Sequence, residues 1–147
     1  LVSINEADVA FESNEVANGN GDGIGIDGPG RVVVRGNHIH GNRWSGLSTW
    51  KSVDVEIADN RIRSNGQSGI SVREAAARVA IRRNDLATNE GNGINVSNSS
   101  GVTIEGNTVT RTAKKLTAVW WDTAQGSPRF GSGNTVDGQP LRTDAPN

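Results

Sequence analysis

Apolar and polar residues alternate along this chain in short runs that return at a nearly constant interval. Each interval holds a Val-x-Ile segment, a second apolar segment after an Asn, and a Gly-Ile-x-Val segment. The Asn recurs at positions 14, 37, 60, 84 and 107, with spacings of 23, 23, 24 and 23 residues, and the Gly recurs at 23, 46, 69 and 93. Because the Asn and the Gly recur with the same spacing, the sequence predicts a solenoid with coils of about 23 residues, in which each series forms a column.

The spacing inside each interval identifies the type of solenoid. Apolar residues lie two apart, as in β-strands, and not three or four apart as in helices. The Leu-x-x-Leu-x-Leu frame of leucine-rich repeats is absent. We therefore predict an all-β fold, a single-stranded parallel β-helix with three short strands per coil and roughly five to six rungs.

The repeat also predicts where regularity ends. Its length makes residues 1–147 one domain, with regular coils over 1–109 and an irregular C-terminal coil and tail over 110–147. If Ala118 takes the Gly position, Val119 and Trp121 point inward and Trp120 points outward. Val2-Ser-Ile4 matches Ile70-Ser-Val72, so the chain begins inside a coil. We expect a fragment or module of a longer β-helix, able to associate end to end through its uncapped first rung.

The Asn columns are interpreted as structural. We expect Asn14, Asn37, Asn60, Asn84, Asn107 and Asn134 to occupy a tight turn in the left-handed conformation that Asn tolerates, with side chains hydrogen-bonded into a ladder. The same interpretation applies to Asn42, Asn65 and Asn89.

Composition limits the function. A net charge of −1 gives no basic surface for nucleic acid, and the absence of Cys excludes disulfides and thiol chemistry. No apolar run has membrane-spanning length, so we expect no membrane insertion. His38 and His40 flank the inward Ile39 and face outward. They could hold a metal ion, but no third ligand is evident in an adjacent rung, and we expect no metal site.

Segments such as Val102-Thr-Ile-Glu-Gly-Asn-Thr-Val109 and Asn65-Gly-Gln-Ser-Gly-Ile-Ser-Val72 resemble the repeats of the pectate-lyase-like superfamily of right-handed parallel β-helices. The resemblance covers residues 2–109 and is strongest to the sugar-hydrolase and carbohydrate-binding repeats shared with alginate C5-epimerases. It implies a right-handed coil and a secreted or cell-surface protein. It also implies a polysaccharide or oligosaccharide partner, bound in a groove along the third strand of each coil.

Aromatic and polar residues gather on that predicted face. We expect the outward side of the third strands and their flanking loops to carry the substrate-binding residues Trp44, Trp50, Arg73, Trp120 and Asp122. Flat aromatic faces beside Arg, Asp, Asn and Ser suit sugar rings, which have apolar C–H faces and many hydroxyls. The alternative is that Trp44 and Trp50 fold over the surface of the solenoid and shield it.

Catalysis stays an open question. Lys51 and Arg73 resemble the Lys base and nearby Arg of superfamily lyases, and Asp122 resembles the catalytic carboxylate of some β-helical glycosidases, which need a second carboxylate. Only Asp137 and Asp144 follow Asp122. Calcium ligands of the lyase type are not recognisable, so no cofactor is expected. Lyase, epimerase and glycoside hydrolase remain the candidate activities, and the alternative to a carbohydrate-active protein is a structural spacer or adhesin-type scaffold.

Overall fold

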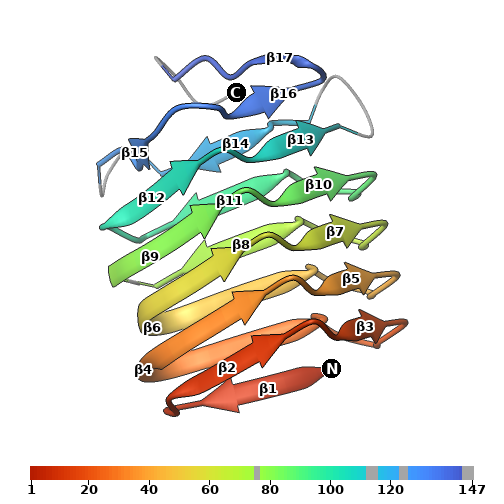
Figure 1. The fold of residues 1–147 in the computed structure, drawn as a ribbon, viewed down its shortest axis with the longest axis vertical. Helices are drawn as coiled ribbons and strands as arrows, with labels where there is room; N and C mark the ends of the chain where they lie inside the picture. The colour runs from red at the N-terminus through yellow and green to blue at the C-terminus, as the bar shows by residue number, and fades with distance from the viewer. Residues whose placement is uncertain (75–76, 112–115, 123–125, 144–147) are drawn as a thin grey trace.

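The computed structural model describes residues 1–74, 77–111, 116–122 and 126–143. Short strands stack along one axis, with the first strands of the chain at one end and the last strands at the other (Figure 1). Strands of neighbouring coils pair in parallel, and the last two strands pair antiparallel to each other. The predicted all-β parallel β-helix is confirmed.

The first and third strands of the coils share one ten-stranded sheet. In two coils the third strand continues without a break into the first strand of the next coil. These two long strands, which turn from one face of the solenoid to another along their length, are β4 (Ile24–Arg35) and β6 (Leu47–Ala58). The other strands of this sheet are β1 (Val2–Asn5), β2 (Val9–Glu12), β8 (Ile70–Arg73), β9 (Ala77–Arg82), β11 (Ile94–Ser97), β12 (Val102–Glu105), β14 (Val119–Trp121) and β15 (Arg129–Phe130).

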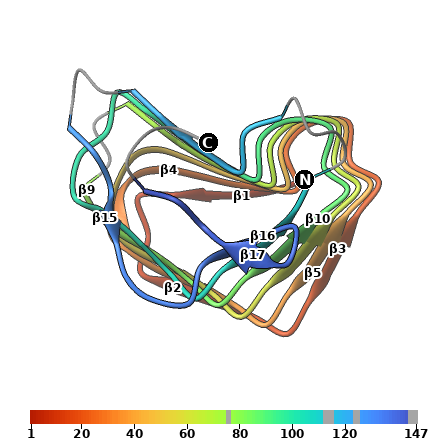
Figure 2. The same cartoon turned by 90° about the horizontal axis from the view of Figure 1, so that it is seen from above.

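The second strands form a separate sheet along one side of the solenoid (Figure 2). Its parallel members are β3 (Glu15–Ala17), β5 (His38–His40), β7 (Arg61–Arg63), β10 (Asp85–Ala87), β13 (Thr108–Thr110) and β16 (Thr135–Val136), and β17 (Gln139–Pro140) adds an antiparallel edge. Six stacked strands in the described part of this sheet agree with the five to six rungs predicted.

The core is a set of aliphatic columns inside the coils. One column runs Val34, Ile57, Ile81 and Ile104, and each of these side chains is fully buried. In the first coil the equivalent Phe11 is only partly buried, as are Val2 and Val9. The N-terminal edge of the sheet therefore has inward side chains that no further rung covers in this structure.

Each inward Asn binds the Asn of the next rung. The amide nitrogen of Asn60 donates to Asn84 Oδ1 at 3.0 Å, and the backbone N–H of Asn60 donates to the same oxygen at 3.0 Å. Equivalent bonds join Asn14, Asn37, Asn60, Asn84, Asn107 and Asn134, and a shorter ladder joins Asn42, Asn65 and Asn89. The two predicted ladders are present.

The expected reason for Asn at these turns is wrong. The left-handed residue is the one before the ladder Asn, as at Asp59 (φ 57°), Arg83 (φ 52°) and Gly106 (φ 65°). The Asn itself has ordinary backbone angles, so its side chain and not its conformational tolerance explains the column. The Asn side chain hydrogen-bonds buried backbone groups at a corner of the coil, where the backbone hydrogen bonds between strands are interrupted.

The Gly column has a packing explanation. A Cβ on Gly69 would lie 2.8 Å from the carbonyl oxygen of Gly93, closer than two such atoms can approach. Ala118 takes the next position of the column, with its carbonyl accepting from the N–H of Ile94 at 2.9 Å. Val119 and Trp121 are buried beyond it and Trp120 is half-buried, as the sequence predicts.

Candidate functional site

The third strands present one outward column of residues along the solenoid. Ser48 pairs with Ser71, Ser71 with Asn95, and Asn95 with Trp120. At the end of these strands Asp27 pairs with Trp50, and Trp50 pairs with Arg73. Neighbouring rungs are about 4.8 Å apart, so side chains from three rungs can contact one ligand. The loops that precede these strands stand out beside them when the solenoid is seen from above (Figure 2).

Trp44 and Trp50 line a shallow pocket at this face. The pocket has a volume of about 150 Å³, and its other lining residues are Asp22, Ser48, Thr49 and Arg73. Trp44 comes from the loop before the third strand, and Trp50 comes from β6. Their side chains are 50% and 51% exposed, so neither indole folds down as a cover for the core. About half of each residue is open to a ligand, and sugar binding by Trp44 and Trp50 stays a prediction.

Asp22 also lines this pocket, and its role was not predicted from the sequence. Its Oδ1 accepts the backbone N–H of Ser45 at 2.9 Å, and its Oδ2 accepts the hydroxyl of Ser48 at 2.7 Å. Both partners belong to the next rung, so the carboxylate fixes the loop that carries Trp44 relative to the strand that carries Trp50. The Gly-Asp-Gly segment before Ile24 was the available sequence signal.

Two cations border the pocket. Arg73 Nε donates to Ser71 Oγ at 2.9 Å, which holds the guanidinium across the outward side of β8. The ammonium group of Lys51 lies 5.9 Å from the centre of the Trp50 ring, within the range of a cation–π contact. Lys51 lies within β6 and has a left-handed backbone (φ 51°), so the strand changes direction there. It follows Trp50, the residue that pairs with Arg73, and so does not continue the column that holds Arg73.

Trp120 and Asp122 share the face but lie outside the pocket. Trp120 is three rungs from Ser48 in the outward column, about 14 Å at the usual strand spacing. The backbone N–H of Asp122 donates to Val96 at 3.0 Å, which places Asp122 at the corresponding end of β14. The predicted binding residues therefore divide into one cluster of Trp44, Trp50 and Arg73 and a second, distant pair.

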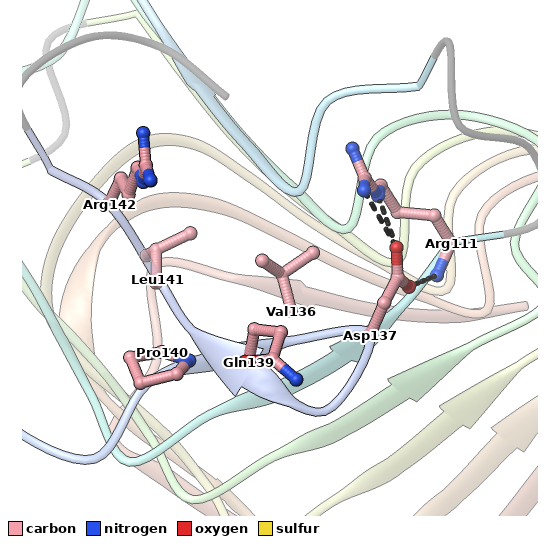
Figure 3. Close-up of a pocket in the computed structure, with 7 residues that line it drawn as sticks. All are labelled: Arg111, Val136, Asp137, Gln139, Pro140, Leu141 and Arg142. Carbon is pink, nitrogen blue, oxygen red and sulfur yellow. Dashed lines mark hydrogen bonds and ion pairs between the residues drawn. The ribbon is translucent and has the colours of Figure 1, made fainter.

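Asp137, one of the two acidic residues that follow Asp122, lies at another corner of the coil. Asp137 follows β16 and binds the guanidinium of Arg111 at 2.7 Å beside a hollow of about 590 Å³ (Figure 3). Val136, Pro140 and Leu141 form the apolar side of this hollow. Asp144 lies outside the described residues. Catalytic roles for Asp122, Lys51 and Arg73 therefore stay predictions.

The second sheet brings together a cluster that the sequence analysis discounted. Glu15 pairs with His38 across neighbouring rungs, and His40 Nε2 lies 2.9 Å from Glu15 Oε1. The nearest ligand-type atoms of Glu15, His38 and His40 all lie within 4.8 Å of one another. Glu15 therefore supplies a third candidate ligand from the adjacent rung, where none was evident in the sequence.

The described residues include no helix long and apolar enough to cross a membrane. The chain also aligns with one solved structure, the A-module of a mannuronan C-5 epimerase from Azotobacter vinelandii, with a TM-score of 0.69 and 17% sequence identity. The alignment covers 97% of this chain and 52% of the module, so the chain spans about half the length of that module. At this identity the likeness supports the fold.

A search of curated protein sequences finds no match to the chain. The family described as the right-handed β-helix region matches residues 1–137, almost the whole chain. The match agrees with the parallel coils of about 23 residues and adds the right-handed sense of the coil. The chain belongs to the right-handed β-helix family.

Proposed function

We propose that the protein binds a polysaccharide along the third-strand face, with Trp44, Trp50 and Arg73 as its main contacts. The observation that carries the proposal is the pocket in which two half-exposed indoles meet a guanidinium and hydrogen-bonding side chains. Indole faces stack on the apolar faces of sugars, and the polar groups around them bind hydroxyls. The outward column continues at the strand spacing from Ser48 to Trp120, which suits an extended chain of sugars.

A polysaccharide that carries carboxylates is expected to bind better than a neutral one. Arg73 and Lys51 border the pocket, and Asp22 is already hydrogen-bonded within the protein. An Arg side chain binds a carboxylate through paired, charge-assisted hydrogen bonds. The similar module belongs to a mannuronan C-5 epimerase, which is consistent with a uronate chain. The proposal involves no cofactor, and it implies a protein that is secreted or exposed at the cell surface.

The test is affinity electrophoresis in gels that contain either a polyuronate or a neutral β-glucan. Trp50→Ala should weaken retention by the polyuronate about tenfold or more, equal to about 1.4 kcal/mol. Arg73→Gln should weaken polyuronate binding and leave any neutral-glucan binding almost unchanged. Arg61→Gln is the matched control, because it removes the same charge from β7 on another face. Equal retention of the parent, Trp50→Ala and Arg73→Gln proteins would refute the site.

A scaffold function is the second candidate, in which the coils serve as a spacer that binds no glycan. Val2, Val9 and Phe11 are only partly buried, and the outer edges of β1, β2 and β3 pair with no described strand. An open parallel edge with apolar side chains can accept another rung. This function would show as concentration-dependent, end-to-end association of the chain together with no binding to any glycan.

A further inference from the structure

The second candidate site lies on the second sheet and is independent of the third-strand face. In a β-strand, residues two apart point to the same side, so His38 and His40 both face outward on either side of the buried Ile39. Their ring centres are 4.3 Å apart. Glu15 is directly opposite His38 on the neighbouring rung, and Ala17, which has no side chain beyond Cβ, is opposite His40.

The three side chains have the geometry of a metal site that needs little adjustment. A tetrahedral ion with ligands at about 2.0–2.2 Å holds its ligand atoms roughly 3.3 Å apart. The Glu15 and His40 atoms are already 2.9 Å apart, and the whole set lies within 4.8 Å. Small rotations of half-buried His38 and exposed Glu15 would bring all three atoms onto one centre, because both side chains reach solvent.

Two arginines on the next rung act on the charge of the site. Arg63 pairs with His40 across the sheet, but its guanidinium binds Asp85 and its charge is compensated. Arg61 pairs with His38. A dication in the site would be repelled by Arg61, so this residue should reduce affinity without removing the site.

We propose that Glu15, His38 and His40 bind one divalent transition-metal ion with the ligand preferences of Zn²⁺, with solvent completing the coordination. Two imidazoles and one carboxylate are a ligand set that suits this ion, and an open fourth position leaves it accessible. The proposal goes beyond polysaccharide binding, because these residues lie on the second sheet and share no residue with the Trp44–Trp50 pocket.

The chain offers a clean test because it contains only two His and no Cys. Titration with Zn²⁺ should be followed by calorimetry and by the NMR signals of the two imidazole rings. We expect one ion per chain and shifts of both ring signals. Glu15→Gln should weaken binding about tenfold, in line with loss of a ligand, and Arg61→Gln should strengthen it severalfold.

A His38→Thr, His40→Thr double variant supplies the decisive control. Thr108 and Thr110 occupy the same two columns three rungs further on, so this fold already carries Thr at such positions. The variant should keep the parent melting temperature without metal and lose calorimetric Zn²⁺ binding. Undiminished Zn²⁺ binding by the double variant, or ring signals of the parent that do not move at saturating Zn²⁺, would overturn the proposal.

Discussion

At the scale of single residues, the Asn ladder shows how one side chain stabilises a corner of the coil. Asn60 donates to the carbonyl oxygen of Val34 at 2.9 Å and to Asn84, and its Oδ1 accepts from the backbone and the side chain of Asn37. All four bonds are buried, so removal of the side chain leaves backbone groups without partners and without access to water.

Asn60→Ala should therefore lower the free energy of unfolding by about 2–4 kcal/mol, as measured by urea denaturation. Asn14→Ala is the control, since Asn14 belongs to the same ladder but is exposed in the first rung, and it should cost no more than about 1 kcal/mol. Equal losses for the two variants would show that the ladder contributes little.

Thr49 illustrates the opposite case, a buried polar atom that the fold does not use. Its side chain takes an inward position between Ile26 and Val72, and its hydroxyl has no hydrogen-bond partner in the described structure. Thr49→Val keeps the shape and removes the unpaired hydroxyl, so it should raise the free energy of unfolding by about 1 kcal/mol. A decrease in the urea midpoint would mean that the hydroxyl is satisfied in solution.

At the scale of elements, each rung is stabilised by its neighbours through the aliphatic columns. Ile81 is fully buried between Ile57 and Ile104. Each such side chain contributes about 1.5–3 kcal/mol through burial. Because the rungs contact only their neighbours, one damaged column should separate the solenoid into two weakly coupled halves.

Ile81→Asp should cost at least about 4 kcal/mol, because it places an unpaired charge in the core. We expect the urea unfolding curve of this variant to lose the form of a single transition. The matched substitution Thr103→Asp adds the same charge on the outward side of the adjoining strand β12 and should leave unfolding almost unchanged. A parent-like transition for Ile81→Asp would contradict the columnar core.

The corners before the ladder Asn carry ion pairs that connect rungs. Arg83 Nε and Nη2 donate to the Asp59 carboxylate at 2.7 and 2.9 Å, and these bonds hold the pKa of Asp59 below its usual value. A carboxylate with a lowered folded-state pKa stabilises the fold above its unfolded-state pKa. That stabilisation is lost as the pH falls through the folded-state pKa.

The melting temperature of the parent should therefore fall as the pH decreases below about 4. Asp59→Asn should flatten part of this decrease, and Arg83→Gln should do the same because it removes the partner that lowers the pKa. Both side chains are largely exposed, so the effect should be small and weaker at high salt. Parallel pH profiles for all three proteins would show that the pair contributes nothing.

At the scale of the whole molecule, the sequence predicts the column of nearly every residue but not which side chains meet across rungs. Periodicity was enough for the coil length, the inward columns, the Asn ladders and the side of the solenoid that carries Trp44 and Trp50. It was wrong about which residue of the turn has the left-handed backbone conformation. The ladder positions require Asn for its side-chain hydrogen bonds and not for its backbone preference. It missed Asp22 and discounted Glu15, because their roles depend on side-chain contacts between neighbouring rungs, which join residues 23 to 26 positions apart in the sequence.

The face-wide site that the sequence suggested is narrower in the structure. Columns alone place Trp120 and Asp122 on the same side as Trp50, but two intervening rungs separate them from Trp50. An extended polysaccharide could contact both regions, whereas a disaccharide would reach only the pocket. Direct contact between sugar and the Trp44 and Trp50 indoles therefore decides whether the protein has the proposed function.

The most direct test follows the indole N–H signals of the four Trp residues in a ¹⁵N-labelled protein during titration with an oligouronate. The proposed site predicts saturable shifts for Trp44 and Trp50, smaller changes for Trp120, and no change for Trp121, which is 3% exposed. Indole signals that stay fixed at millimolar oligouronate, or move equally for Trp50 and buried Trp121, would contradict polysaccharide binding at this face.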